Sequence, residues 1–225
     1  MNAALLLLAD ARFPSGGHAH SAGVEPSAGV GDVVDLDSLR DFVRGRLATS
    51  GAVDAAFAAA TSARCVDDGD VPWVQLQAEY MARTGSPRLR AASNTLGRQL
   101  LRAGRRAFPS HRFDEAAAVL GASMAQPLAM GLLAAAAGCS PAEAALCELH
   151  HLVGSTTSAG VRLLGLDPFA IAAFAAELAP VLEQLAADAA VWCRADLADL
   201  PADIALLNDV LAEHHATWEV RLFAS

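Results

Sequence analysis

Residues 140–164 read SPAEAALCELHHLVGSTTSAGVRLL, and this stretch decides the fold class. Ser140 and Glu143 form a Ser-x-x-Glu capping box, and Pro141 takes the first helical position, so a helix is predicted to begin here. Apolar side chains then recur at the spacing of one helix face, which is typical of a long amphipathic helix. These residues are Leu146, Leu149, Val153, Val161 and Leu164.

Helical patterns extend outward from this stretch in both directions. On its N-terminal side, the sequence predicts helices over residues 35–63 and 88–107, the first behind an Asp-rich start. On its C-terminal side, the Asp-Pro step at 167–168 predicts the next helix, which Pro180 is expected to kink or divide. Pro201 is expected to open the last helix. Its predicted apolar stripe is Ile204, Leu207, Leu211, His214 and Trp218.

Residues 116–142 carry no charge and are long enough to suggest a membrane span. Gln126-Pro127 interrupts their middle, and alanine makes their hydrophobicity marginal, so two buried helices fit better. The sequence shows no convincing alternation of apolar and polar residues that would predict a strand. We therefore predict an all-α bundle of about eight to ten helices, with a Gly/Pro loop near the N-terminus and a non-helical C-terminal tail.

Length and composition favour one domain spanning residues 1–225. Hydrophobic residues make up 54% of the chain, and the sequence contains no Pro/Gly/Ser linker long enough to separate two cores. The cysteines lack Cys-x-x-Cys spacing and mostly lie in apolar helical segments, which indicates reduced core thiols. Residues 1–9 lack the basic start of a signal peptide, so a cytoplasmic location is expected. The cysteines are Cys65, Cys139, Cys147 and Cys193.

The chain contains no lysine, so all 16 of its basic residues are arginines. This composition excludes Schiff-base chemistry and the lysine of a Walker-type nucleotide site. Residues 83–112 hold eight arginines, and Arg98, Arg102 and Arg105 share one face of the predicted helix. Sparse aromatic residues and a net charge of −9 argue against nucleic-acid binding. The arginine face is then either a solvated surface or a surface for an acidic partner.

The two ends of the chain carry its most unusual segments. Residues 12–25 read RFPSGGHAHSAGVE and are predicted to form a shaped loop. Pro14 fixes its own φ and favours an extended Phe13, whereas the glycines of this segment permit positive φ. At the other end, residues 218–225 read WEVRLFAS.

Together these segments resemble the UreF family of urease accessory proteins. That family opens with a Pro-x-Gly-Gly loop followed by Ser-x-Gly-Leu-Glu, and it closes with Arg-Leu-Phe-x-Ser. Residues 90–100 and 162–165 resemble two interior patterns of the family more loosely. Val24 replaces the leucine of the opening pattern, and His18 and His20 stand where the family usually has aromatic residues.

The resemblance implies a scaffold that is not an enzyme and needs no cofactor. Proteins of this family act with a UreD/UreH-type accessory subunit and a UreG-type GTPase to load nickel into the urease apoenzyme, and the resemblance implies a homodimer. We expect neither nucleic acid nor membrane as a partner. An arginine supplied to the GTPase, from Arg221 or from residues 83–112, is a candidate regulator of GTP hydrolysis. The residues expected to bind partners are Phe13, Pro14, Gly16, Gly17, His18, His20, Ser21, Gly23, Glu25, Arg98, Arg102, Arg105, Arg221, Leu222 and Phe223.

No recognisable catalytic motif occurs in the sequence, so no catalytic residue is predicted. Two groups of side chains are candidates for metal binding, because imidazole and thiolate suit nickel or zinc. One group is Cys147, His150 and His151 in the capped helix, and the other is His18 with His20 in the loop. A stand-alone nickel- or zinc-binding protein is therefore the alternative to a scaffold. Against it, adjacent histidines on a helix point about 100° apart.

Overall fold

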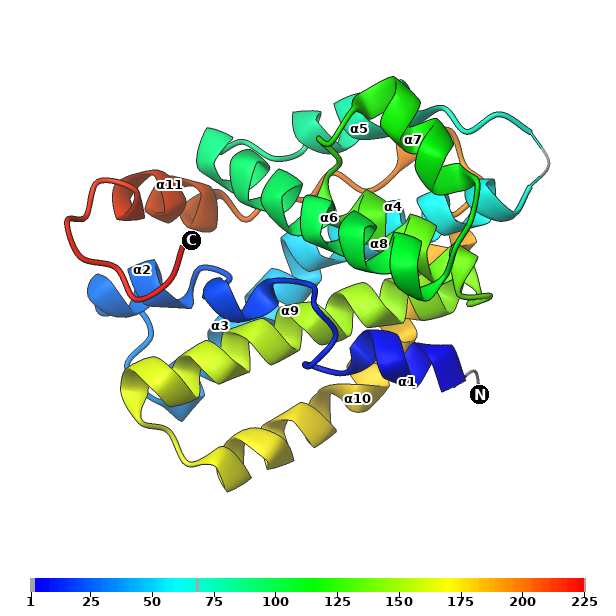
Figure 1. Ribbon diagram of the computed structural model, residues 1–225. Coiled ribbons are helices and arrows are strands. Elements are labelled where there is room, and N and C mark those ends of the chain that lie inside the picture. Colours follow the sequence, from blue (N-terminus) through cyan, green and yellow to red (C-terminus); the bar gives the residue numbers. More distant parts are fainter. Residues whose placement is uncertain (1–2, 68, 225) are drawn as a thin grey trace.

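The computed structural model describes residues 3–67 and 69–224, and every regular element within them is helical (Figure 1). The predicted all-α fold is therefore confirmed. Short 3-10 turns lie at Gly17–Ala19 and Leu197–Asp199. The α-helices are α1 (Ala3–Ala9), α2 (Val24–Gly29), α3 (Leu36–Arg46), α4 (Ala52–Val66), α5 (Trp73–Ala82), α6 (Pro87–Ala107), α7 (Arg112–Leu120), α8 (Gln126–Ala136), α9 (Pro141–Leu164), α10 (Pro168–Val191) and α11 (Leu206–His215).

Helices α4, α8 and α9 form the centre of the bundle. Helix α4 packs against α8, α9 and α10, while α6 packs on α8 and α10 packs along α9. In Figure 1, α9 crosses the middle of the molecule, and α2, α11 and the C-terminus lie together at one side. The buried side chains fall into two clusters, one around Phe57 and Leu128 and the other around Leu149 and Phe174.

Glycines allow the central helices to approach closely at two crossings. A Cβ added at Gly131 of α8 would lie 2.4 Å from the carbonyl oxygen of Ala58 in α4. At Gly97 of α6, an added Cβ would lie 2.0 Å from the carbonyl oxygen of Met124, just before α8. Both distances are far inside van der Waals contact, so a larger residue would force the helices apart.

Helix α9 begins and ends as the sequence predicts. Ser140 accepts a hydrogen bond from the backbone N–H of Glu143, whose side chain accepts one from the N–H of Ser140. Gly165 ends the helix in the left-handed conformation, with φ of 64°. The helix predicted over 88–107 is also confirmed, since α6 spans Pro87–Ala107.

Three boundary predictions are corrected by the structure. The helix predicted over 35–63 is interrupted by a π turn at Leu47–Gly51, where Thr49 leaves the helical region with φ of −120° and ψ of −106°. Helix α10 continues through Pro180, so the predicted division does not occur, while the predicted kink stays a prediction; Pro180 is exposed, so the carbonyl that its ring deprives of a hydrogen bond can bond to water. The last helix begins at Leu206 rather than at Pro201.

The buried face of α11 also differs from the predicted stripe. Only Leu211 is shared, whereas Leu207 and His214 are exposed. The buried positions are instead Asn208, Leu211 and His215, because α11 packs against α2 with a partly polar face.

Helix α10 is the one described helix long and apolar enough to cross a membrane, with a mean hydropathy of 1.5. The segment predicted as two helices over 116–142 is indeed split, between α7 and α8. Within the bundle, α10 packs against α4 and α9 and buries Ile171, Phe174 and Leu178. At least one side of α10 therefore contributes its apolar side chains to the core of the bundle.

Candidate functional site

The N-terminal loop between α1 and α2 takes a fixed shape. Gly16 and Gly23 both adopt positive φ, of 83° and 95°, which confirms the expectation that this loop needs glycine. Ala22 also lies in the left-handed region, with φ of 51°, and its carbonyl oxygen accepts a hydrogen bond of 2.6 Å from the guanidinium of Arg46. Phe13 is buried and anchors the start of the loop in the core.

Glu25, at the end of this loop, holds the C-terminal tail. Its carboxylate accepts hydrogen bonds from the backbone N–H groups of Leu222 and Phe223, at 2.7 and 3.0 Å. The ring Nε2 of His215 lies 3.0 Å from the same carboxylate, so this nitrogen carries a proton that it donates. Glu25 and His215 are both buried, with exposed fractions of 7% and 2%. A buried carboxylate with several donors is a strong local constraint, because each donor would be unsatisfied without it.

Arg162 of α9 holds the other side of the tail. Its guanidinium lies 4.3 Å from the centre of the Phe223 ring, and it donates a hydrogen bond of 3.1 Å to the carbonyl oxygen of His18. The backbone N–H of Ala224 donates to the carbonyl of Ala19 at 2.7 Å. The loop and the tail, which stand at opposite ends of the sequence, are thus joined by direct contacts, and the C-terminus lies beside α2 in Figure 1.

Helix α11 completes this junction. A Cβ added at Gly23 would lie 2.0 Å from the side-chain oxygen of Asn208, and one added at Gly29 would lie 2.2 Å from the Trp218 ring. The ring of His215 lies 4.9 Å from that of Trp218, edge to face. A larger residue at either position would therefore displace the Asn208 or Trp218 side chain, and the positive φ of Gly23 favours glycine there in addition.

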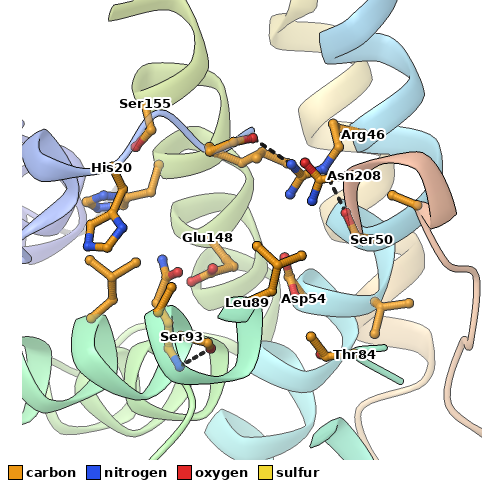
Figure 2. Close-up of a pocket in the computed structure, with 18 of the residues that line it drawn as sticks. His20, Arg46, Ser50, Asp54, Thr84, Leu89, Ser93, Glu148, Ser155 and Asn208 are labelled. Atoms are coloured by element: carbon orange, nitrogen blue, oxygen red, sulfur yellow. Dashed lines mark hydrogen bonds between the residues drawn. The ribbon is translucent and has the colours of Figure 1, made fainter. Parts of the chain in front are cut away.

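A polar cavity of about 140 Å³ lies behind the loop (Figure 2). Its wall includes His20 from the loop, Arg46 from α3, Asp54 from α4 and Glu148 from α9. Tyr80 donates a hydrogen bond of 2.8 Å to the carboxylate of Asp54. One carboxyl oxygen of Glu148, Oε2, is buried and has no hydrogen-bond partner among the described residues.

Burial controls the ionisation of the two acids in this cavity. It raises the pKa of Asp54 to about 6, although the hydrogen bond from Tyr80 and the charge of Arg46 act in the opposite direction. It also raises the pKa of Glu148 well above its usual range, and the neighbouring Asp54 adds to this effect. The cavity therefore holds carboxyl groups that keep their protons more readily than exposed acids do.

Comparison with known proteins identifies the family of this chain. The model of the family described as UreF matches residues 33–179. The chain belongs to the UreF family. It is 42% identical to a urease accessory protein UreF of Mycolicibacterium vanbaalenii over 226 residues, which cover 99% of this chain and 98% of that protein. Proteins of the same name from Mycobacterium sp. strain JLS and Mycobacterium tuberculosis strain H37Rv are 39% and 35% identical, over 98% and 99% of this chain and 97% and 98% of their own lengths.

The residues expected to bind partners differ in exposure in this UreF-family structure. One group is exposed at the surface and includes the arginine face of α6, where Arg105 lies 3.5 Å from Asp114. The other group is buried and shapes the junction from within. Exposed are Pro14, His18, Arg98, Arg102, Arg105, Arg221 and Leu222, and buried are Phe13, Ser21, Gly23, Glu25 and Phe223, with Gly16, Gly17 and His20 between these extremes.

Exposed Arg221 borders a groove of about 430 Å³ between the junction and α6. The same groove is bordered by Arg88 and by apolar side chains that include Leu89 and Leu96. Leu222, next to Arg221, is 68% exposed. This side of the molecule thus combines apolar side chains with two arginines, Arg88 and Arg221.

Several residues that organise the UreF-family site were not found from the sequence. Arg46 and Arg162 donate hydrogen bonds to carbonyl groups of the loop, far away in the chain, and Asn208 lies against Gly23. Glu148 offered one signal, because an acid stands in an otherwise apolar part of the α9 sequence. The spacing of Arg46, Arg162 and Asn208 in the sequence did not indicate these contacts, because the tertiary fold decides which residues they meet.

The structure also separates the members of one predicted metal group. Cys147 is buried in the core, where burial raises the pKa of its thiol to about 12, so the thiol stays protonated and is a poor ligand. His150 and His151 lie elsewhere, on the wall of a second cavity that also includes His18 and His20. The histidines of the two predicted groups, His18, His20, His150 and His151, thus line one cavity, and Cys147 does not.

Proposed function

We propose that this chain is a scaffold in urease maturation. In this role it joins a UreD/UreH-type accessory subunit to a UreG-type GTPase while nickel is inserted into the urease apoenzyme. The observation that supports the proposal best is the junction of the loop and tail, because the segments that carry the family pattern form one surface. Arg221 and Leu222 are exposed on that surface, and the backbone N–H groups of Leu222 and Phe223 are held by Glu25.

The physical logic is that of a preorganised interface. The tail is held by backbone hydrogen bonds to Glu25 and by the stacking of Arg162 on Phe223, so little ordering entropy remains to be lost when a partner binds. An exposed leucine beside an arginine offers an apolar anchor and a charge for orientation. The role is non-enzymatic and cytoplasmic, and a homodimer would present two copies of the surface.

The arginine face of α6 offers a second contact within the same proposal. Arg98 and Arg102 are exposed and project from a helix whose opposite face packs on α8. Such a surface suits an acidic partner, whose association would weaken as salt concentration rises. Control of the GTPase by Arg221 is tested separately: replacement by alanine would then lower GTP hydrolysis in the assembled complex without loss of binding.

Coexpression of the chain with its UreD/UreH-type subunit and GTPase tests the proposal. Complex mass is measured by size exclusion with light scattering, for the full chain and for a chain that ends at Glu219. We expect a defined complex with the full chain and its loss on truncation. Failure of both forms to assemble would reject the scaffold.

A further inference from the structure

The polar cavity behind the loop contains a buried carboxyl oxygen that is free to accept a hydrogen bond. Glu148 is 4% exposed, and its Oε2 atom has no hydrogen-bond partner among the described residues. Figure 2 shows this side chain pointing from α9 toward the middle of the cavity. Buried polar atoms are almost always paired, because an unsatisfied acceptor costs about 1–3 kcal/mol. Glu148 therefore offers a strong acceptor to a molecule that enters this cavity.

Other groups on the same wall can bind a polar molecule as well. One carboxyl oxygen of Asp54 accepts from the hydroxyl of Tyr80 at 2.8 Å, which leaves its second oxygen able to accept from another donor. Arg46 donates through Nη1 to the carbonyl of Ala22 and through Nε to the hydroxyl of Ser50, which leaves Nη2 able to donate to another acceptor. The wall thus combines two acceptors with one donor.

Hydrogen-bond matching and size narrow the chemistry of the bound molecule. The wall carries charges of both signs, from Arg46 and Arg83 and from acids that include Asp209. A carboxylate ligand would approach the arginines but would bring no N–H group to Glu148, and an ammonium ligand would bring N–H groups but no acceptor for Arg46. Burial also raises the pKa of Asp54 and of Glu148, so these acids attract a cation less than exposed acids do. The volume of about 140 Å³ is close to that of an engineered cavity of about 150 Å³ that binds benzene, so only a small molecule fits.

We propose that this cavity binds a small neutral molecule with a primary amide group. The N–H groups of the amide donate to Glu148 and Asp54, and its carbonyl oxygen accepts from Arg46. Leu89, on the same wall, covers a short aliphatic part of the molecule (Figure 2). Because His20 of the loop also lines the cavity, the bound molecule contacts the loop from inside the protein.

An NMR titration of the isotope-labelled full-length chain with propionamide tests this site. Propionate has nearly the same shape but no N–H group, and propylammonium has N–H groups but no carbonyl, so these two compounds are the matched control ligands. The same titration is made with Glu148→Gln, which keeps an acceptor, with Glu148→Leu, which removes it, and with Glu183→Leu. Glu183 is an exposed acid of α10 outside the cavity, so this last variant controls for the loss of a carboxylate. Circular dichroism and thermal melting verify that each variant is folded.

We expect saturable binding of propionamide to the wild type with a Kd of about 1 mM, and shifts of the backbone amides of Asp54 and Ser93 on the cavity wall. Glu148→Gln should bind within about threefold of the wild type, Glu148→Leu about tenfold more weakly or less, and Glu183→Leu like the wild type. The proposal is overturned if propionamide does not saturate the wild type, if the shifts lie away from the cavity, or if either control ligand binds as tightly. Those three results need no substitution, so they decide the question even if Glu148→Leu does not fold. The proposal does not rest on the scaffold role, because the isolated chain is measured.

Discussion

Replacement of Glu25 by alanine tests the junction between loop and tail directly. The change removes the acceptor of two backbone N–H groups and of the His215 ring. A buried donor left without its acceptor costs about 1–3 kcal/mol, so we take about 3–5 kcal/mol for the three donors together. In a chain of this length, each kcal/mol lowers the melting temperature by about 2–4 °C, so the full penalty would correspond to roughly 6–20 °C.

The tail also has a route that limits this penalty. If residues 219–224 detach, their amides bond to water, and the part of the loss that comes from the tail cannot exceed the free energy with which the tail docks. We therefore expect a moderate fall in melting temperature together with a large local effect. Hydrogen exchange of the Leu222 and Phe223 amides should accelerate about 100-fold or more, which corresponds to roughly 3 kcal/mol.

The matched control is Glu219→Ala, which removes an exposed carboxylate from the same tail. This variant should melt and exchange like the wild type. If Glu25→Ala also kept the wild-type melting temperature and the wild-type exchange rates at Leu222 and Phe223, the assignment of Glu25 as the residue that holds the tail would be wrong.

The cavity, the helix crossings and the Arg162 contact give further predictions. Because burial raises the pKa of Glu148 in the folded state, its contribution to stability is greatest below the unfolded pKa of about 4.3 and falls as pH rises. In Glu148→Gln the unfolding free energy should therefore fall less steeply than in the wild type as pH rises from about 5 to about 8. Chemical denaturation at several pH values measures this dependence, and the same dependence in both proteins would contradict the prediction. Gly97→Ala should destabilise by about 2 kcal/mol or more, because the added methyl would meet the Met124 carbonyl. Gly45 lies at an exposed position of α3 where an added Cβ would meet nothing within 4 Å, so Gly45→Ala should instead stabilise the protein by about 0.5–1 kcal/mol. If both alanine variants shifted the denaturant midpoint equally, close packing at Gly97 would not explain its effect. Arg162→Ala should loosen the tail by about 1–2 kcal/mol, measured as faster exchange at Ala224 with little change in global melting.

Local signals predicted much of the fold because they act within one turn of chain. The capping box at Ser140 and Glu143 and the Asp-Pro step at 167–168 mark helix starts through residues that act only on near neighbours. The positive φ of Gly16 and Gly23 likewise follows from loop composition. These features needed no knowledge of tertiary contacts.

Other features depend on packing, and the sequence alone did not predict them. Pro180 lies inside α10 without dividing it, at an exposed position that spacing does not reveal. The buried face of α11 is partly polar, since His215 bonds to Glu25 and Asn208 lies against Gly23. Apolar periodicity therefore selected the wrong stripe. The cluster of His18 with His150 was also hidden, because the two residues are far apart in sequence.

The surface that the tail presents to a UreD/UreH-type partner is the central claim, and an affinity measurement tests it most directly. Leu222→Glu changes an exposed side chain whose backbone N–H still bonds to Glu25, so the fold and melting temperature should be preserved. We predict that the partner binds this variant at least about tenfold more weakly than the wild type, because a charge replaces an apolar anchor. Wild-type affinity in Leu222→Glu and in the chain that ends at Glu219 would show that the tail only packs on its own core, and would contradict the account.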